Sequence, residues 1–273
     1  MNKNIEEVEF TIFDTETTGL DPGSGDRIVE IAAVRLKGKD RLSEFQTLVN
    51  PQAKISPAAF QVNRITEEML NGAPRIEEVM PEFLSFIRGS CLCSYNAAFD
   101  LGFLNSELAL CGRAGLEDIV VADILKMAKR LLPGLERYAL WFVAEKLGID
   151  IQQAHRALAD VALTIEVFNK LKEILAVKGI SDFQSFSSLF GLSSHFLDDL
   201  INQKLAQIQQ AIDLKVKIKI KYLSRSSAAV SEREVIPKEV RKENNRYYLI
   251  GYCCLRNEER SFRVDGILHL EII

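Results

Sequence analysis

The feature that most constrains this chain is an apolar segment that ends in two acidic residues. Residues 8–14 read Val-Glu-Phe-Thr-Ile-Phe-Asp, which is typical of a buried strand, and Glu16 follows two positions after Asp14. Residues two apart on a strand project to the same face, so both carboxylates point toward one place. Adjacent anions repel, and burial raises their pKa values further unless a cation neutralises them. The pattern therefore indicates a divalent metal ion at this strand end.

Two later segments carry further groups of the same kind. Asp100 ends the segment Asn96-Ala-Ala-Phe-Asp, and His155 precedes Asp160 by five positions. Oxygen ligands alone suit Mg²⁺ or Mn²⁺, whereas Zn²⁺ normally recruits His or Cys. Two such ions, about 3.5–4 Å apart, can activate a water and stabilise the leaving oxygen of a phosphodiester. The residue types thus favour phosphoryl chemistry.

Each cluster also has a simpler interpretation. Asp14 and Glu16 could end a solvated strand before a turn, and Asp100 could merely stabilise the positive end of an expected helix at 97–110. A histidine such as His155 is more often a surface or packing residue than a base. Asp-x-Glu alone occurs often by chance. Three clusters in this order argue against coincidence.

In order and spacing, the three clusters resemble the DnaQ-like DEDDh 3′→5′ exonucleases, which include polymerase proofreading subunits, ribonuclease T and oligoribonuclease. The resemblance covers roughly residues 7–175. It implies a ribonuclease H-like fold and two bound ions, Mg²⁺ or Mn²⁺. It also implies a catalytic set of four metal ligands, Asp14, Glu16, Asp100 and Asp160, and a general base, His155.

The same resemblance implies residues that contact the 3′-terminal nucleotide. They are Thr17, Leu20, Val62, Asn63, Asn96 and Phe99, with Leu20 as an apolar wedge. The sequence departs from the family at Tyr95, where proofreading subunits often have His, and at Asn63-Arg64, where many relatives have His-Gly. Substrate contacts are therefore more open to change than metal binding.

Composition places limits on the class of protein. A chain of 273 residues with 47% hydrophobic and 26% charged residues can bury one sizeable core and a small second domain. It has no signal-peptide pattern and no apolar stretch of the ~18 residues that a membrane span needs. Five cysteines without Cys-x-x-Cys spacing favour reduced thiols over disulfides or zinc. We therefore expect a cytoplasmic protein without a membrane partner.

The expected elements change type along the chain. Strands are expected at 8–14, 27–36, 41–49, 91–93 and 119–122, and helices at 76–88, 97–110, 123–131, 138–147 and 157–174. This order predicts an α/β domain at 7–175 with a mixed sheet flanked by helices. A helical connector is expected at 176–210, with a helix from about 194 to 213, and a small all-β domain at 211–273.

The last segment begins with Lys and apolar residues in strict alternation from Lys215 to Tyr222, which predicts a half-buried strand. Its lysines could protect a sheet edge or contact phosphates. Further strands are expected at 232–237, 246–254 and 260–264. Residues 176–273 carry a net charge of +3, from 15 basic and 12 acidic residues, against −7 for residues 1–175. The basic part could therefore add affinity for polyanions.

This tail resembles a WYL domain, a ligand-sensing module with an SH3-like β-barrel. The resemblance rests on Tyr222, on Arg233-Glu-Val-Ile-Pro237, on Tyr-Tyr-Leu at 247–249 in place of Trp-Tyr-Leu, and on residues 260–265. Gly266 stands where the family often has Arg. The residues that we expect to contact a small anionic or nucleotide ligand, or phosphates, are Arg233, Tyr248, Arg260 and Arg263.

The leading hypothesis is a metal-dependent 3′→5′ exonuclease that releases nucleoside monophosphates from the 3′ end of single-stranded DNA or RNA. The C-terminal domain would regulate the enzyme or tether its substrate. The alternative is a non-catalytic nucleic-acid or nucleotide sensor on a nuclease scaffold. DNA and RNA share the phosphodiester that the motifs address, so the sequence does not decide between them. It does not reveal a polymerase partner either.

Overall fold

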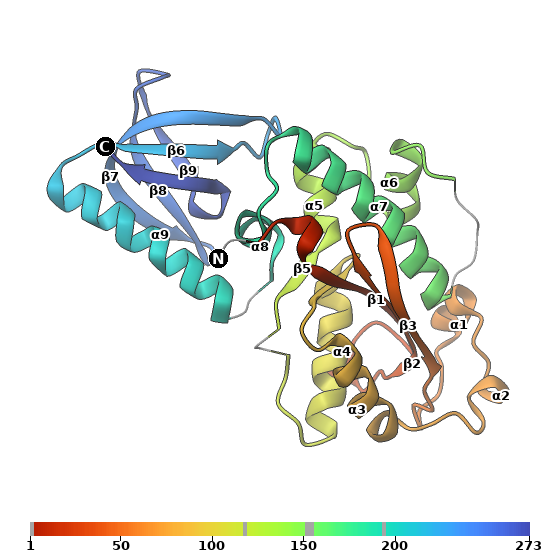
Figure 1. The fold of residues 1–273 in the computed structure, drawn as a ribbon. Helices are drawn as coiled ribbons and strands as arrows, with labels where there is room; N and C mark the ends of the chain where they lie inside the picture. Colours follow the sequence, from red (N-terminus) through yellow and green to blue (C-terminus); the bar gives the residue numbers. More distant parts are fainter. Residues whose placement is uncertain (1–2, 117–118, 151–155, 193–194) are drawn as a thin grey trace.

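The chain forms a larger α/β part followed by a smaller all-β part (Figure 1). The structure, a computed structural model, describes residues 3–116, 119–150, 156–192 and 195–273. Each part contains a five-stranded sheet. Two consecutive helices, α8 and α9, connect them (Figure 1).

The larger sheet is mixed and has the order β3-β2-β1-β4-β5. Its strands are β1 (Glu9–Thr17), β2 (Ile28–Lys37), β3 (Asp40–Leu48), β4 (Cys91–Ser94) and β5 (Val121–Asp123). β1, β2 and β3 are antiparallel neighbours, whereas β4 and β5 run parallel to β1. The carboxyl ends of β1, β4 and β5 therefore meet at one edge of the sheet, where open α/β sheets bind their ligands.

Helices cover both faces of this sheet. The helices of this part are α1 (Pro57–Asn63), α2 (Glu67–Leu70), α3 (Ile76–Ile87), α4 (Ala97–Leu110), α5 (Ile124–Leu131), α6 (Leu140–Lys146) and α7 (Ala157–Val177). Of these, α3 and α4 pack on one face of the sheet, and α5 and α7 on the other. The alternation of β1 explains the two layers, because Phe10 faces α7 and Phe13 faces α3. Phe10 meets Phe168 edge-on at 5.1 Å, and Phe13 lies 6.2 Å from Phe83.

The connecting helices belong to different cores. α8 (Phe183–Phe190) packs on the larger sheet, where the ring of Phe186 lies 5.4 Å from that of Phe10. α9 (His195–Leu214) contributes Ile208 and Ala211 to the core of the smaller sheet. The expected connector is thus built from one helix of each part.

The smaller sheet is entirely antiparallel, in the order β10-β6-β7-β8-β9. Its strands are β6 (Ile218–Leu223), β7 (Val230–Glu243), β8 (Arg246–Cys253), β9 (Glu258–Arg263) and β10 (Ile267–Ile272). The expected fold class, an α/β domain with a mixed sheet and a small all-β domain, is confirmed. The expectations did not include α1, α2, α8 or β10.

Close packing joins the two parts. Arg130 of α5 is 6% exposed and forms an ion pair with Asp265, which follows β9. Gly266 faces the same contact: a Cβ there would lie 2.7 Å from the ring of Tyr222 and 2.9 Å from Nη2 of Arg130. A larger residue at position 266 would therefore collide with a side chain of the other part.

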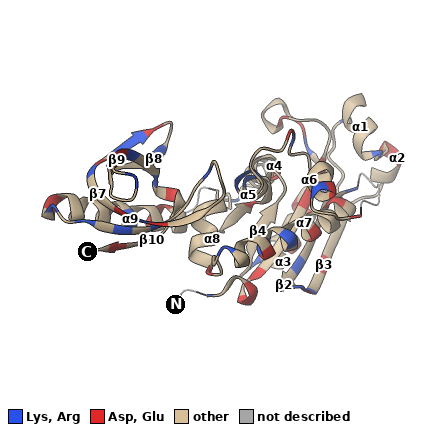
Figure 2. Ribbon diagram, turned by 90° about the horizontal axis from the view of Figure 1, so that it is seen from above, with Lys and Arg blue, Asp and Glu red and all other residues tan. Residues whose placement is uncertain are grey.

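The lysine-rich segment differs from its prediction in two ways. The strand begins at Ile218, because Lys215 and Val216 close the end of α9 with backbone bonds to Ile212 and Ala211. β6 is also an interior strand, so the edge-protection interpretation is wrong. Two lysines instead form ion pairs with β7: Lys217, just before β6, with Glu234, and Lys219 of β6 with Glu232. Figure 2 shows both charges on the strands of this sheet.

Two further observations concern the thiols and the helices. All five cysteines lie in the described part of the chain and are free, and Cys91, Cys93 and Cys253 are buried.

Among the described residues, no helix combines the length and the apolar character needed to cross a bilayer.

Candidate active site

Three carboxylates meet at the carboxyl edge of the larger sheet. Asp14 and Glu16 project from the end of β1, and Asp160 reaches them from the first turn of α7. One oxygen of each lies within 4.8 Å of the others, and all three side chains are half-buried. Three oxygen donors at this spacing can bind one face of a divalent cation.

Asp100 is fixed beside this group. It lies in the first turn of α4, where its Oδ1 accepts hydrogen bonds from the Thr15 backbone N–H (3.0 Å) and hydroxyl (2.8 Å). Its Oδ2 accepts a third from the Ser94 hydroxyl at 2.5 Å. Because Thr15 separates Asp14 from Glu16, these bonds fix Asp100 to the strand that carries those two carboxylates.

The electrostatics of the group call for a cation. Burial, followed by the charges of Asp100 and Glu16, raises the pKa of Asp14 well above its ordinary value. Burial and the charge of Asp160 raise the pKa of Glu16 to about 7. Burial raises the pKa of Asp100 to about 6, against the opposing effect of its hydrogen bonds. Oxygen donors with these raised pKa values fit a hard divalent ion, which would stabilise their charged forms.

Glu30, a fully buried carboxylate on β2 directly opposite Glu16, was not among the expected site residues. Its oxygens accept hydrogen bonds from Arg156 Nη2 (2.7 Å) and Nε (3.0 Å) and from Gln46 (2.9 Å). Arg156 immediately precedes α7, so Glu30 holds the start of the helix that carries Asp160. The available signal was a lone Glu inside the apolar run at 28–34, because a fully buried Glu is almost always paired.

The expected base, His155, lies outside the described residues. Its neighbour Arg156 is described, and Glu30 fixes it as above. The position of the chain next to His155 is therefore set by an ion pair whose carboxylate, Glu30, is buried. The role of His155 stays a prediction.

The expected substrate contacts after β1 fall into two kinds. Leu20 and Val62 are 84% and 56% exposed, so both apolar side chains are open to a ligand. Thr17 and Asn63 are buried: the Thr17 hydroxyl donates to Gly19 O, and the Asn63 amide donates to Thr17 O at 3.2 Å. The structure therefore gives Asn63 a role in positioning this loop, and a direct substrate contact stays a prediction.

The family departure at Arg64 has a visible conformational cost. Arg64 ends α1 in the left-handed region with φ 57°, which favours Gly. Its guanidinium lies 6.0 Å from the centroid of Phe60. This position therefore carries a cationic side chain beside the loop of Asn63.

The expected substrate contacts around α4 also differ from one another in their surroundings. Asn96 is exposed, with φ 70°, and caps α4 without a side-chain bond. Phe99 packs on Phe103 at 5.0 Å. Tyr95, the second family departure, donates its hydroxyl to Tyr138 O at 2.7 Å. Tyr95 therefore ties the end of β4 to the segment before α6.

The expected ligand contacts of the smaller domain do not form one group. Arg260 and Arg263 are three residues apart on β9, so they project to opposite faces. Arg260 is paired with Glu258 at 3.2 Å, and Arg233 donates to Ser231 at 3.0 Å. Tyr248 lies opposite Arg263 in the β8–β9 pairing. Of these residues, Arg263 lines a cavity beside the larger domain.

Comparison of the sequence with known families agrees with this geometry. A family model described as Exonuclease matches residues 11–168, more than half of the chain, and one described as WYL domain matches residues 203–272. DNA polymerase III subunit epsilon of Treponema pallidum is 42% identical over 168 residues, which cover 61% of this chain and 77% of that protein. DNA polymerase III PolC-type of Thermotoga maritima is 33% identical over 269 residues, or 96% of this chain. The chain spans only 19% of that polymerase.

Solved structures share the fold. Exonuclease X in complex with 5′ overhanging duplex DNA is 27% identical, with a TM-score of 0.51, and the match covers 70% of this chain and 98% of that one. E. coli Exonuclease I in complex with a dT13 oligonucleotide is similar in fold, with a TM-score of 0.58 at 18% identity over 89% of this chain and 55% of that one. The protein therefore belongs to the exonuclease family, as a DnaQ-like member homologous to 3′→5′ exonucleases, with a C-terminal WYL domain.

Proposed function

We propose that the protein is a metal-dependent 3′→5′ exonuclease that hydrolyses the last phosphodiester bond at the 3′ end of single-stranded nucleic acid and releases a nucleoside monophosphate. The observation that carries the proposal is the group of Asp14, Glu16 and Asp160, with Asp100 fixed beside it. Family membership supports the same reaction class.

We assign a different role to each group of residues in the site. Asp14, Glu16, Asp100 and Asp160 would hold two divalent ions, Mg²⁺ or Mn²⁺, which supply positive charge to the reacting phosphate. We propose His155 as the group that accepts a proton from the attacking water. An imidazole with an ordinary pKa near ~6.5 is ready to accept a proton at neutral pH. Glu30 would position His155 through Arg156.

A single strand is the proposed substrate form, because a terminal nucleotide has to leave its neighbours to reach buried carboxylates. The exposed Leu20 and Val62 offer apolar contacts for a base. DNA is the first candidate, because Exonuclease X, 27% identical to this chain, is bound to DNA in its structure. We place the enzyme in the cytoplasm, in keeping with its free thiols.

The direct test is the digestion of 5′-labelled DNA and RNA strands with free or blocked 3′ ends. We expect a ladder that shortens from the free 3′ end, requires Mg²⁺ or Mn²⁺, and stops in chelator. Asp14→Asn should abolish it, while exposed Asp40→Asn, at the far edge of the sheet, should not. Metal-independent shortening would refute the proposal. Binding without any cleavage would favour the non-catalytic sensor.

A further inference from the structure

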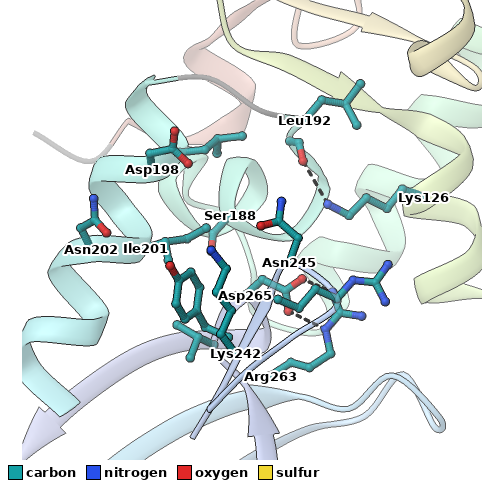
Figure 3. Close-up of a pocket in the computed structure, with 15 residues that line it drawn as sticks. Lys126, Ser188, Leu192, Asp198, Ile201, Asn202, Lys242, Asn245, Arg263 and Asp265 are labelled. Carbon is teal, nitrogen blue, oxygen red and sulfur yellow. Dashed lines mark hydrogen bonds and ion pairs between the residues drawn. The ribbon is translucent and has the colours of Figure 1, made fainter. Parts of the chain in front are cut away.

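A cleft runs along the boundary between the nuclease domain and the WYL domain. Two cavities of roughly 500 and 310 Å³ adjoin there and share Lys126, Arg246 and Arg263. Figure 3 shows Lys126 of α5 and Arg263 and Asn245 of the WYL domain lining the larger one, with α9 residues Asp198 and Asn202 on another side. Neither domain alone supplies the walls.

The smaller cavity is strongly basic. Its lining contains one carboxylate, Asp123, and six cationic side chains: Lys126, Lys129, Arg130, Arg225, Arg246 and Arg263. Asp123 caps α5, accepting from the backbone N–H groups of Leu125 and Lys126. Asp265 is the nearby counter-charge, paired with both Arg263 and Arg130. Positive charge therefore remains in excess.

Two of these cations are held away from water. The side chain of Arg130 is 7% exposed, and its Nε is buried with no hydrogen-bond partner. Lys126 is half-buried, and its ammonium donates to Gly191 O at 3.0 Å. Burial lowers the pKa of both groups. A buried cation without full compensation is costly, and an anionic ligand in the cleft would offset that cost.

The cleft begins close to the carboxylate group. β1, β4 and β5 are consecutive neighbours, so the end of β5 lies two strand spacings, about 10 Å, from Asp14. Asn96, which follows β4, and Asp123, which ends β5, both line the basic cavity. The cations on α5 come directly after Asp123. The basic walls thus continue along the sheet edge that carries the metal ligands.

We propose that this cleft binds backbone phosphates of the substrate strand, on the 5′ side of the nucleotide held at Asp14, Glu16 and Asp160. The inference rests on the proposed exonuclease function. It assigns α5 of the nuclease domain and Arg246 and Arg263 of the WYL domain to one phosphate-binding surface. The arrangement favours a strand over a small nucleotide because the cations extend through two adjoining cavities from Asn96 to Arg246.

Binding in chelator separates this proposal from catalysis. Lys129→Ala combined with Arg246→Ala removes one exposed cation from each wall. Lys37→Ala combined with Arg256→Ala is the matched control, because both are exposed, one in each domain, and neither lines the cleft. The affinity of a fluorescent single-stranded eicosamer is measured across a salt series for the full-length proteins.

We expect the cleft variant to bind the eicosamer more weakly than wild type, with a salt slope shallower by about 0.7 for each phosphate that the variant no longer neutralises. Its cleavage of a dinucleotide with Mg²⁺ should equal that of wild type, since the one phosphate of a dinucleotide is the scissile phosphate at the carboxylate group and none is left to contact Lys129 or Arg246. The control pair should match wild type in both assays. Equal affinity and slope in the cleft and control variants would overturn the proposal.

Binding of a mononucleotide tests whether the cleft takes a free nucleotide or the phosphates of a strand. If the cleft variant failed to bind thymidine monophosphate but bound the eicosamer like wild type, the site would be a small-ligand site and the strand assignment would be wrong. A wild-type protein that binds the eicosamer through the cleft but shortens no labelled strand with Mg²⁺ would instead refute the exonuclease proposal.

Discussion

At the scale of single residues, Glu30 shows how a group that is not among the expected metal ligands can shape the site. It is fully buried opposite Glu16, and it holds Arg156 through two hydrogen bonds of 2.7 and 3.0 Å. Arg156 follows His155 directly and precedes the helix with Asp160. The carboxylate of Glu30 therefore acts on the site through the position of the backbone.

Glu30→Gln should lower the rate of the chemical step at saturating metal. The variant weakens the bond to Arg156, and a displacement near 1 Å at a catalytic group can cost about 10²-fold. Single-turnover kinetics at saturating metal measure the effect. Glu107→Gln is the control, because Glu107 is equally buried and pairs with Arg27 away from α7.

Both variants should lose stability by about 1–3 kcal/mol, the usual range for disturbing a hydrogen bond to a charged group. Only Glu30→Gln should slow the reaction. Equal loss of rate in the two variants would show that Glu30 acts through stability alone.

His155→Ala should reduce the chemical step by about 10²–10⁴-fold, the range for a positioned base. Wild-type activity should fall as the pH drops through the titration of the imidazole, and the variant should lack that limb of the profile. His269→Ala, an exposed histidine on β10, serves as the control. Rates that match wild type would remove His155 from the mechanism.

At the scale of elements, the strands and long helices of the nuclease domain follow from apolar periodicity. β1, β2, β3, α3, α4 and α7 lie within a few residues of their expected bounds. The short helices α1 and α2 could not be foreseen, because seven and four residues carry too little periodicity. α8 was not expected, because serines interrupt the apolar residues of its segment, 183–190. The expected metal ligands were identified from motifs, whereas Glu30 required the β1–β2 register.

The packing of α8 on the nuclease core determines where the chain can be truncated without loss of stability. A fragment that ends near residue 176 keeps the expected catalytic residues but loses Phe186 and Phe190, which are fully buried in the nuclease core. We expect this fragment to be several kcal/mol less stable than one that ends at Leu192, since removal of one buried Phe side chain typically costs about 3–5 kcal/mol. Urea unfolding of the two fragments measures the difference. Equal midpoints would show that α8 contributes little to this core.

At the scale of the whole molecule, the carboxylate group makes stability depend on metal and pH. The pKa of Glu16 rises to about 7 and that of Asp100 to about 6 in the folded protein. Between the ordinary and the raised pKa, the folded state holds more protons than the unfolded chain. Stability therefore falls as the pH rises through this interval.

The metal-free protein should accordingly lose unfolding free energy as the pH rises from about 4.5 to about 7. Mg²⁺ should reverse the loss, most strongly at the higher pH, because deprotonated ligands bind the ion. Thermal unfolding across pH with and without Mg²⁺ tests both statements, and Asp14→Asn should flatten both dependences. A metal-free protein that grew more stable over this interval would contradict the raised pKa values.

The packing at Gly266 bears on how such proteins can be assembled by recombination. The space that a side chain at 266 would take is filled by Tyr222 of the same domain and by Arg130 of the nuclease. A WYL domain transplanted from another protein would bring its own residue to this position, and any residue larger than Gly would strike Arg130. Chimaeras of this enzyme should therefore exchange positions 130 and 266 together, because the residue at 266 in one domain has to fit the side chain at 130 in the other.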